Sequence, residues 1–226
     1  MIRVERKITE KAKKAIESLQ KAKSKNNTYN TQEVNVALKE MFHGKCYICE
    51  NKEITSYQIE HLFSHHEDKD LKYDWSNLFL ACAHCNNIKR DKYEPIIDCT
   101  KENVDQLIAF RKKGYFGTEE ELIFESLDCR EETINTQKLL KEVYYGSTPQ
   151  KKMEAKILRR TLRKEISKFK EYVREYQEAE DEEKEDLKYL LKQQLGDSSP
   201  FAAFKRWLIR DNKEAYPELL IYINMQ

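Results

Sequence analysis

The chain has 226 residues, of which 36% are charged and 39% are hydrophobic, and its formal net charge at pH 7 is +1. No run of about 20 apolar residues occurs, so the sequence predicts no membrane-spanning helix. Nothing at its start resembles a signal peptide, and a chain of this length needs no disulfide staples, so we expect the six cysteines to act as thiols.

The first region, residues 1–42, is expected to be helical. Apolar residues recur at helical spacing over residues 9–23, which predicts a first helix. Asn30 followed by Glu33 is typical of a capping box, and this predicts a second helix that ends near Phe42.

Two Cys-x-x-Cys pairs follow in the second region, residues 43–95. Zn²⁺ prefers thiolate ligands, and a closed site of four cysteines leaves no coordination position for water, so such a site is structural. The 32 residues from 50 to 81 exceed the roughly 15–20 of a compact zinc ribbon, so a further unit is expected between the pairs. The predicted zinc ligands are Cys46, Cys49, Cys82 and Cys85. Cys99 and Cys129 have no partner at ligand spacing and are expected to be ordinary thiols.

The segment between the pairs predicts two strands and a helix. Residues 54–59 are β-branched and aromatic and predict a strand that ends at Glu60 and His61. Residues 75–81 predict a second strand that runs into the second cysteine pair, and residues 85–91 predict a short helix. A strand, a strand and a helix in this order would place their polar side chains around one cleft.

The same residues carry a family resemblance. The segment resembles an HNH endonuclease of the zinc-bearing type in three motifs: Glu60-His61, Asn77-Leu78, and Cys82-x-x-Cys85-Asn86-x-x-Lys89. This resemblance implies a small ββα-metal nuclease core over residues 43–95, stapled by the four-cysteine zinc site and embedded in a mostly α protein.

The expected chemistry is hydrolysis of a phosphodiester bond, which needs an activated water and stabilisation of the leaving oxygen. Neutral imidazole accepts a proton near pH 7, so His61 is the expected general base. Glu60 and Asn86 offer the oxygen ligands that a catalytic Mg²⁺ or Mn²⁺ prefers. Asn77 completes the catalytic set by holding the loop that orients His61. Two neighbouring cations are expected to contact nucleic-acid phosphates: Lys89 and Arg90.

Two positions depart from the commonest pattern of this family. Glu60 stands where Asp is frequent and Asn86 stands where His is frequent, which leaves the preferred catalytic metal open. His65 and His66, in a polar loop, are expected to be solvated rather than ligands.

A narrower resemblance is to the HNH nuclease subunit of Septu-type bacterial anti-phage defence systems. It rests on the chain length, the opening residues 1–4, and two further motifs: Tyr73-Asp74-Trp75-Ser76-Asn77-Leu78 and Phe201-Ala202-Ala203-Phe204-Lys205-Arg206-Trp207. The resemblance implies an effector nuclease in the bacterial cytoplasm, controlled by an ATP-binding-cassette-like ATPase partner. DNA is the expected substrate, and RNA stays open.

The third region, residues 96–146, is expected to be a helical extension. A helix is predicted from Thr100 through Phe110, a strand or extended piece over 121–127, and a helix over 132–145. A Gly-Ser-Thr-Pro run then marks the clearest internal boundary, before a C-terminal helical region.

This fourth region, residues 147–226, contains a basic amphipathic helix at 151–170, with nine Lys or Arg against two Glu. It is a candidate surface for nucleic acid or a protein partner, and a solvated face over a core stripe fits equally well. The acidic run 178–186 could also pair with it within the chain. A positive surface is needed somewhere, because residues 44–95 hold seven Lys or Arg against nine Asp or Glu. The aromatic stripe that begins at Phe201 is expected to be core.

Two other functions stay open on the sequence alone. The chain could be a catalytically silent zinc module that binds nucleic acid or bridges proteins, or an HNH nuclease that acts without an ATPase.

Overall fold

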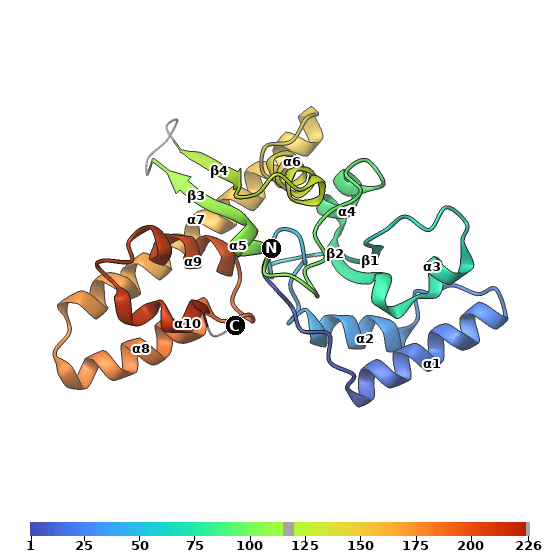
Figure 1. The fold of residues 1–226 in the computed structure, drawn as a ribbon, viewed down its shortest axis with the longest axis horizontal. Coiled ribbons are helices and arrows are strands. Elements are labelled where there is room, and N and C mark those ends of the chain that lie inside the picture. Colours follow the sequence, from blue (N-terminus) through green and yellow to red (C-terminus); the bar gives the residue numbers. More distant parts are fainter. Residues whose placement is uncertain (115–119, 225–226) are drawn as a thin grey trace.

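A computed structural model describes residues 1–114 and 120–224, without the side chains of Asp181 and Asn224. The described part is mostly helical and holds two small antiparallel sheets (Figure 1). The first half contains α1 (Glu10–Ser24), α2 (Gln32–Met41), β1 (Tyr57–His61), α3 (Lys69–Tyr73), η1 (Trp75–Asn77), β2 (Leu78–Cys82) and α4 (Ala83–Lys89). The second half contains α5 (Val104–Leu107), β3 (Ile108–Lys113), β4 (Glu121–Ser126), α6 (Glu131–Tyr145), α7 (Pro149–Glu178), α8 (Asp181–Leu195), α9 (Ala202–Asp211), η3 (Pro217–Leu219) and α10 (Ile221–Asn224).

The two N-terminal helices form as the sequence predicts, with one change at a cap. Thr9 caps α1 by accepting a hydrogen bond from the backbone N–H of Ala12. The cap of α2 is Thr31 rather than Asn30, because the Thr31 hydroxyl accepts from the N–H of Val34 at the third helical position.

The strand pair and helix of the second region also form, but each strand starts three residues later than predicted. β1 and β2 pair antiparallel with Tyr57 opposite Cys82 and His61 opposite Leu78. The second strand starts late because the Asp74 carboxylate accepts from the N–H of Ser76 and turns η1. Every residue of β2 is buried, and the chain passes directly from β2 into α4.

The predicted helix from Thr100 through Phe110 is wrong for most of its length. Only α5 is helical, and the chain then enters β3, which pairs with β4. Phe110 lies opposite Phe124 in this pair, with ring centroids 5.5 Å apart, so cross-strand packing outweighs the local helical pattern. The predicted strand at 121–127 is confirmed as β4.

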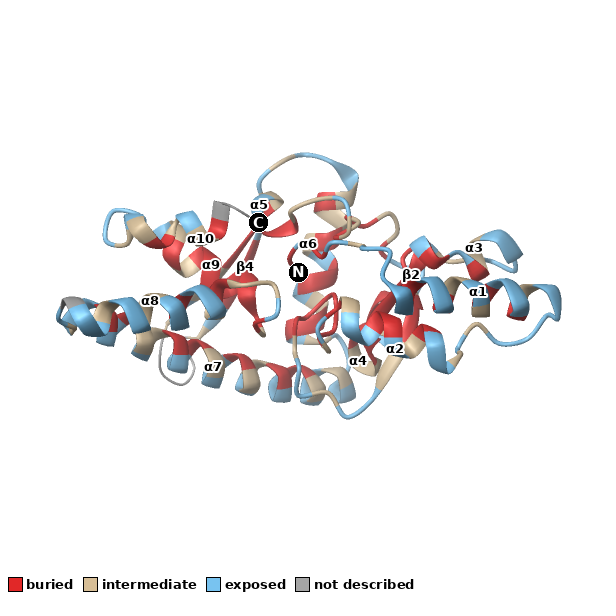
Figure 2. Cartoon of the chain, turned by 90° about the horizontal axis from the view of Figure 1, so that it is seen from below, coloured by how far each residue is buried: buried red, intermediate tan, exposed pale blue. Residues whose placement is uncertain are grey.

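The C-terminal helices pack around two groups of buried apolar side chains. One core runs from the N-terminus through the first sheet to α9, and a smaller one lies between α7, α8 and the last turns of the chain (Figure 2). Phe201, Phe204 and Trp207 are buried, which confirms the predicted core stripe. In the described ranges no helix is long and apolar enough to cross a membrane. The division into four regions stays a prediction.

Candidate functional site

The four cysteines of the two pairs meet at one point. Their sulfur atoms all lie within 4.8 Å of one another, and all four residues are buried. Four Zn–S bonds of about 2.3 Å in a tetrahedron place the sulfurs about 3.8 Å apart, and the Sγ atoms of Cys49 and Cys82 lie 3.9 Å apart. Over residues 1–114 and 120–224, no other cluster of three or more His, Cys, Asp or Glu side chains has this geometry. The cluster therefore fits a tetrahedral metal ion such as Zn²⁺.

The backbone explains why the sulfurs converge. The N–H of Tyr47 donates to the carbonyl of Leu80 at 2.9 Å. This bond fastens residues 46–49, which we call the first cysteine turn, to β2. Cys82 ends β2 and caps α4, where its sulfur accepts from the N–H of Cys85 at 3.5 Å. Burial raises the pKa of Cys49 and Cys85, whereas hydrogen bonds from the other three thiols outweigh burial and lower the pKa of Cys46. A bound cation would stabilise the remaining thiolates.

Glu60, next to the end of β1, is a buried carboxyl with two partners. Its side chain is 4% exposed. One oxygen lies 2.6 Å from the Nζ of Lys89, and the other accepts from the hydroxyl of Tyr47 at 2.6 Å. Burial raises the pKa of Glu60 to about 7, and the nearby ammonium of Lys89 offsets only part of that rise. Glu60 therefore changes charge near neutral pH.

Lys89 points into the protein rather than toward solvent. Its side chain is fully buried, and its ammonium also donates to the carbonyls of His61 at 3.0 Å and Arg90 at 3.1 Å. It lies 3.3 Å from Glu94, which accepts in turn from the backbone and hydroxyl of Ser64. The phosphate contact predicted for Lys89 does not fit this arrangement, because every donor of the ammonium is engaged inside.

His61 has the orientation that a general base requires. Its Nε2 lies 3.0 Å from the carbonyl oxygen of Lys72. A carbonyl only accepts, so we assign the proton to Nε2 and leave Nδ1 as the basic nitrogen. The ring packs edge-on against Tyr29 and His65, at centroid distances of 4.7 and 4.9 Å. Burial lowers the pKa of His61, which favours the neutral ring at pH 7.

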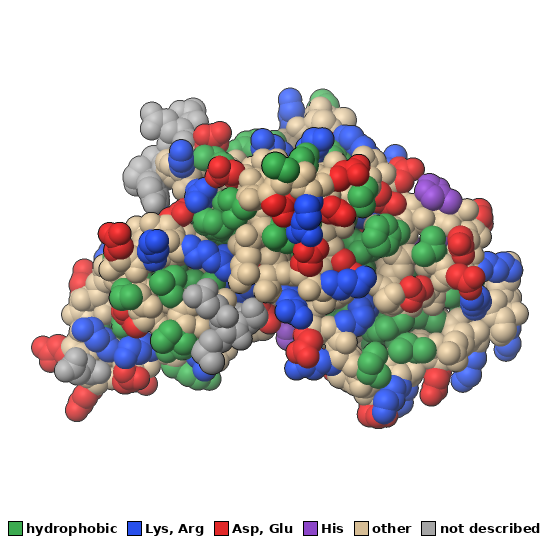
Figure 3. All heavy atoms as spheres, viewed as in Figure 1, with side chains coloured by type: hydrophobic (Ala, Val, Ile, Leu, Met, Phe, Trp, Pro, Cys, Tyr) green, Lys and Arg blue, Asp and Glu red, His purple; other side chains and the backbone are tan. Residues whose placement is uncertain are grey.

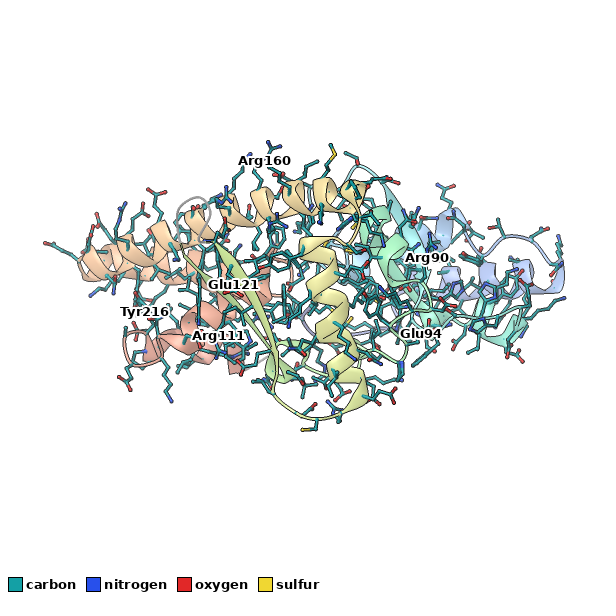
Figure 4. All side chains as sticks on the ribbon, turned by 90° about the horizontal axis from the view of Figure 1, so that it is seen from above. Arg90, Glu94, Arg111, Glu121, Arg160 and Tyr216 are labelled. Atoms are coloured by element: carbon teal, nitrogen blue, oxygen red, sulfur yellow. The ribbon has the colours of Figure 1, made fainter. Side chains whose placement is uncertain are left out.

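A pocket of 340 Å³ opens in front of His61. Asn86 lines it and donates from Nδ2 to the side-chain oxygen of Gln58 at 2.7 Å. Within the described ranges no hydrogen-bond donor approaches the Oδ1 of Asn86, so this oxygen can bind a cation. Arg90 is exposed at the pocket, and Figure 4 shows it together with Glu94. The lining consists of Tyr29, Ile59, Glu60, His61, Ser64, His65, His66, Asn86, Arg90 and Asp91.

Comparison with known families agrees with this geometry. Residues 46–92 match the HNH endonuclease family. The match includes both cysteine pairs, both strands of the first sheet and α4. No curated protein and no solved structure matches the chain. We call residues 46–92 the HNH segment; its family suggests a nuclease with a nucleic-acid substrate and a metal requirement.

Six of the lining residues lie outside the predicted set, and three of them carry aromatic or imidazole rings. Tyr29 comes from the N-terminal helical region, where nothing in the local sequence signals it. His65 is half-buried against His61 rather than fully solvated, whereas His66 is exposed as expected. The sequence shows both histidines in a polar loop after His61, but only the fold shows that this loop lies over the pocket.

Asn77 of the HNH segment has the contacts that a loop-holding residue needs. It is 4% exposed. Its Oδ1 accepts from the N–H of Phe63 at 2.9 Å, and its Nδ2 donates to the carbonyls of Phe63 at 2.9 Å and Leu71 at 3.1 Å. One side chain thus closes the loop that follows His61.

Replacing Asn77 by Ala is expected to loosen this loop. The change leaves three backbone groups of the loop without their partner, at a cost of about 2–4 kcal/mol in unfolding free energy, since a single lost buried partner costs about 1–3 kcal/mol. Urea unfolding of the wild type and the variant measures the difference. Ser76→Ala, one residue away and exposed, is the control and should lose much less stability. Equal stability of the two variants would show that Asn77 does not hold the loop.

Proposed function

We propose that the chain is a metal-dependent HNH endonuclease that hydrolyses phosphodiester bonds, with DNA as its first substrate class and RNA as the second. The observation that carries this proposal is the placement of His61, with a basic Nδ1, in one open pocket with Glu60 and Asn86. The family match of the surrounding segment supports the same reading.

Two metal sites belong to the proposal. The four cysteines hold a structural Zn²⁺, because their four sulfurs lie within 4.8 Å of one another and all four residues are buried. Glu60 and Asn86 are the ligands of a catalytic Mg²⁺ or Mn²⁺, since a carboxylate and a free amide oxygen face the same pocket. When bound there, such an ion would neutralise charge on the scissile phosphate and the leaving oxygen.

The residues of the chain supply the proton transfer and the positioning. Nδ1 of His61 takes a proton from the attacking water, and Nε2–H keeps its hydrogen bond to the carbonyl of Lys72, so the ring does not rotate as it becomes charged. Arg90, exposed at the pocket, binds a flanking phosphate. Asn77 fixes the loop that carries the carbonyl.

Glu60 and Lys89 set the charge state of the site. The Glu60 carboxyl must be ionised to bind a cation, and its pKa of about 7 makes that state available at neutral pH. Lys89 favours ionisation from 2.6 Å and neutralises the buried carboxylate until a cation binds. Lys89 is therefore a positioning residue in this proposal.

We further propose that the chain is the effector nuclease of a Septu-type bacterial anti-phage complex, and that an ATPase partner controls it in the cytoplasm. The sequence resemblance supports this, together with the charge balance. The nuclease region has fewer basic than acidic residues, and Figure 3 shows Lys and Arg mixed with Asp and Glu over the face in view. A face of mixed charge favours control by a second component over tight independent binding.

A plasmid-nicking assay with Mg²⁺ or Mn²⁺ tests the activity. His61→Ala is expected to lower cleavage about 10²–10⁴-fold, because the general base is lost, while zinc content and the melting temperature stay near those of the wild type. His43→Asn is the matched control, since Asn tolerates the backbone φ of 52° at this position and His43 lies outside the pocket. Equal cleavage by wild type and His61→Ala would overturn the assignment of the base.

The same assay, with and without the co-expressed ATPase, distinguishes a nuclease that an ATPase controls from a nuclease that acts alone. Cleavage that requires the ATPase supports the defence-complex form. Full cleavage by the chain alone supports a nuclease that acts without a partner.

A further inference from the structure

One outward face of α7 carries a row of five cations at intervals of four residues. These are Lys152, Lys156, Arg160, Lys164 and Lys168, which we call the basic row, and all five are exposed. Neighbouring members have Cβ atoms about 5–6 Å apart, and the row extends about 24 Å at a rise of 1.5 Å per residue. Each step of four residues turns about 40° at 3.6 residues per turn, so the row winds around the solvent-facing half of the helix, with its three central members within about 80° of one another. Figure 4 shows α7 along one long edge of the molecule, with Arg160 on that edge.

The two acidic residues between 151 and 170, Glu154 and Glu165, contact other helices and do not neutralise the row. Glu154 lies 2.7 Å from the Nδ1 of His84 in α4, and Glu165 lies 3.1 Å from the buried ammonium of Lys205 in α9. In the described part of the chain, no ion pair reaches any member of the basic row. The outward face of α7 is therefore positive over four turns.

The acidic run at 178–186 does not cover the row either. The helix α8, which begins in this run, packs on α7 through apolar side chains, with Phe169 and Val173 of α7 in one core with Leu191 and Leu195 of α8. Among the described side chains, no ion pair joins the run to the basic row. Like charges four residues apart repel, and among the described side chains no carboxylate offsets them; Lys168 lies 5.8 Å from the ring centroid of Tyr172.

The start of α7 contacts α4, the helix that carries Asn86. A hydrogen bond of 2.7 Å between Glu154 and the Nδ1 of His84 fastens the start of α7 to the second cysteine pair. Asn86 follows two residues later, about 200° further around α4, and lines the pocket on the other side of that helix. His84 also lies 2.8 Å from the carbonyl of Val143, which holds α4 against α6. Pocket and row are thus parts of one packed unit.

We propose that the basic row binds the phosphate backbone of the nucleic acid while the HNH segment cuts it, which rests on the proposed function for the identity of the substrate. A strand of B-DNA presents about one phosphate per 3.4 Å, or about seven along 24 Å. The three central cations, Lys156, Arg160 and Lys164, are exposed on one side of the helix and span about 12 Å, which is the length of three to four phosphates. The row supplies the positive surface that the HNH segment lacks, and it recognises backbone charge rather than base sequence.

The test measures how salt weakens binding to a short labelled duplex and to a single strand of the same sequence. A variant with K156Q, R160Q and K164Q removes the centre of the row, and Gln keeps helix propensity. The control, with K14Q, K21Q and K25Q, removes the same charge from exposed positions in and just after α1. Both are made on the His61→Ala chain so that the probe stays intact, and melting temperature and zinc content verify the fold.

The basic-row variant is expected to reduce the slope of log K against log salt by about 2.7 for the duplex, or about 2 for the single strand, and the control by less than about 1. The probe with the larger change identifies the preferred form of nucleic acid. An unchanged slope, or equal changes in the basic-row variant and the control, overturns the proposal. The proposal is also overturned if the basic-row variant binds nucleic acid like the control but loses a protein that co-purifies with the control, because the row would then bind that protein. Nicking by the wild type is measured in parallel, alone and with the co-expressed ATPase: a reduced slope without nicking in either condition supports the row and refutes the nuclease.

Discussion

Replacing Cys82 by Ala is expected to unfold the HNH segment, with loss of its zinc and of all cleavage. Binding of a structural Zn²⁺ contributes about 10–16 kcal/mol to the folding of small zinc domains, whereas a whole domain is stable by only about 5–15 kcal/mol. Cys82 also ends β2 and caps α4. Loss of this one ligand therefore removes a metal contact, a strand end and a helix start together.

Metal analysis of the purified protein and a thermal melt followed by circular dichroism measure this effect. Cys129→Ala is the matched control, because Cys129 is exposed and lies outside the cluster. It should keep one zinc per chain and the wild-type melting temperature. Retention of one zinc and of the wild-type melting temperature by Cys82→Ala would show that the cluster is not the metal site that supports the fold.

The parts of the site that could be predicted from the sequence are those fixed by short-range geometry. A Cys-x-x-Cys pair brings both sulfurs to one turn whatever surrounds it. A β-branched segment that ends in Glu60 and His61 specifies a strand with polar groups at its end, and the strand forms within three residues of its predicted start. The four-cysteine cluster and the placement of His61 and Asn86 in one pocket therefore follow from spacing within the HNH segment.

The parts that could not be predicted depend on packing between distant segments. Lys89 and Arg90 are neighbours of equal charge, yet one is fully buried and the other exposed. Only the phase of α4 against β1 decides which of them meets Glu60. The strand β3 was missed for a related reason, since its apolar residues suit a helix until β4 pairs with it.

The support of the zinc cluster by the C-terminal half was likewise invisible in the sequence. The hydroxyl of Tyr144 donates to the carbonyl of Cys49 at 3.0 Å, and the buried ammonium of Lys45 donates to the carbonyl of Ser199 at 3.0 Å. The first cysteine turn is thus held from α6 and from the loop before α9.

Replacing Lys89 by Met is expected to lower both the stability and the activity of the protein. Removal of one member of a buried ion pair costs about 3–5 kcal/mol where the other member stays charged, so the loss of stability is largest at a pH at which Glu60 is ionised. Without the ammonium at 2.6 Å, the pKa of Glu60 rises above its present value of about 7. The carboxyl is then protonated at neutral pH and binds a cation poorly, so the rise of the cleavage rate with pH moves to more alkaline pH.

The raised pKa of Glu60 also makes the free energy of unfolding depend on pH. The pKa of Glu60 in the folded protein lies above the ordinary value of 4.5 for a Glu side chain, so the fold favours the protonated carboxyl. The wild type therefore loses stability from this group as pH rises from about 4.5 to about 7. In Lys89→Met this loss continues to higher pH, because the folded pKa is higher. Urea unfolding at a series of pH values measures the extent of the window.

Arg90→Met is the control that separates this role from the phosphate contact first expected of Lys89. Arg90 is exposed at the pocket, so its loss should weaken nucleic-acid binding while melting temperature and pH profile stay near those of the wild type. If Lys89→Met behaved in this way instead, with normal stability and an unshifted pH profile, Lys89 would be a phosphate contact after all. A stability loss confined to Lys89→Met would establish that the buried Glu60–Lys89 pair holds the site together, and that Arg90 alone of the two neighbours faces the substrate.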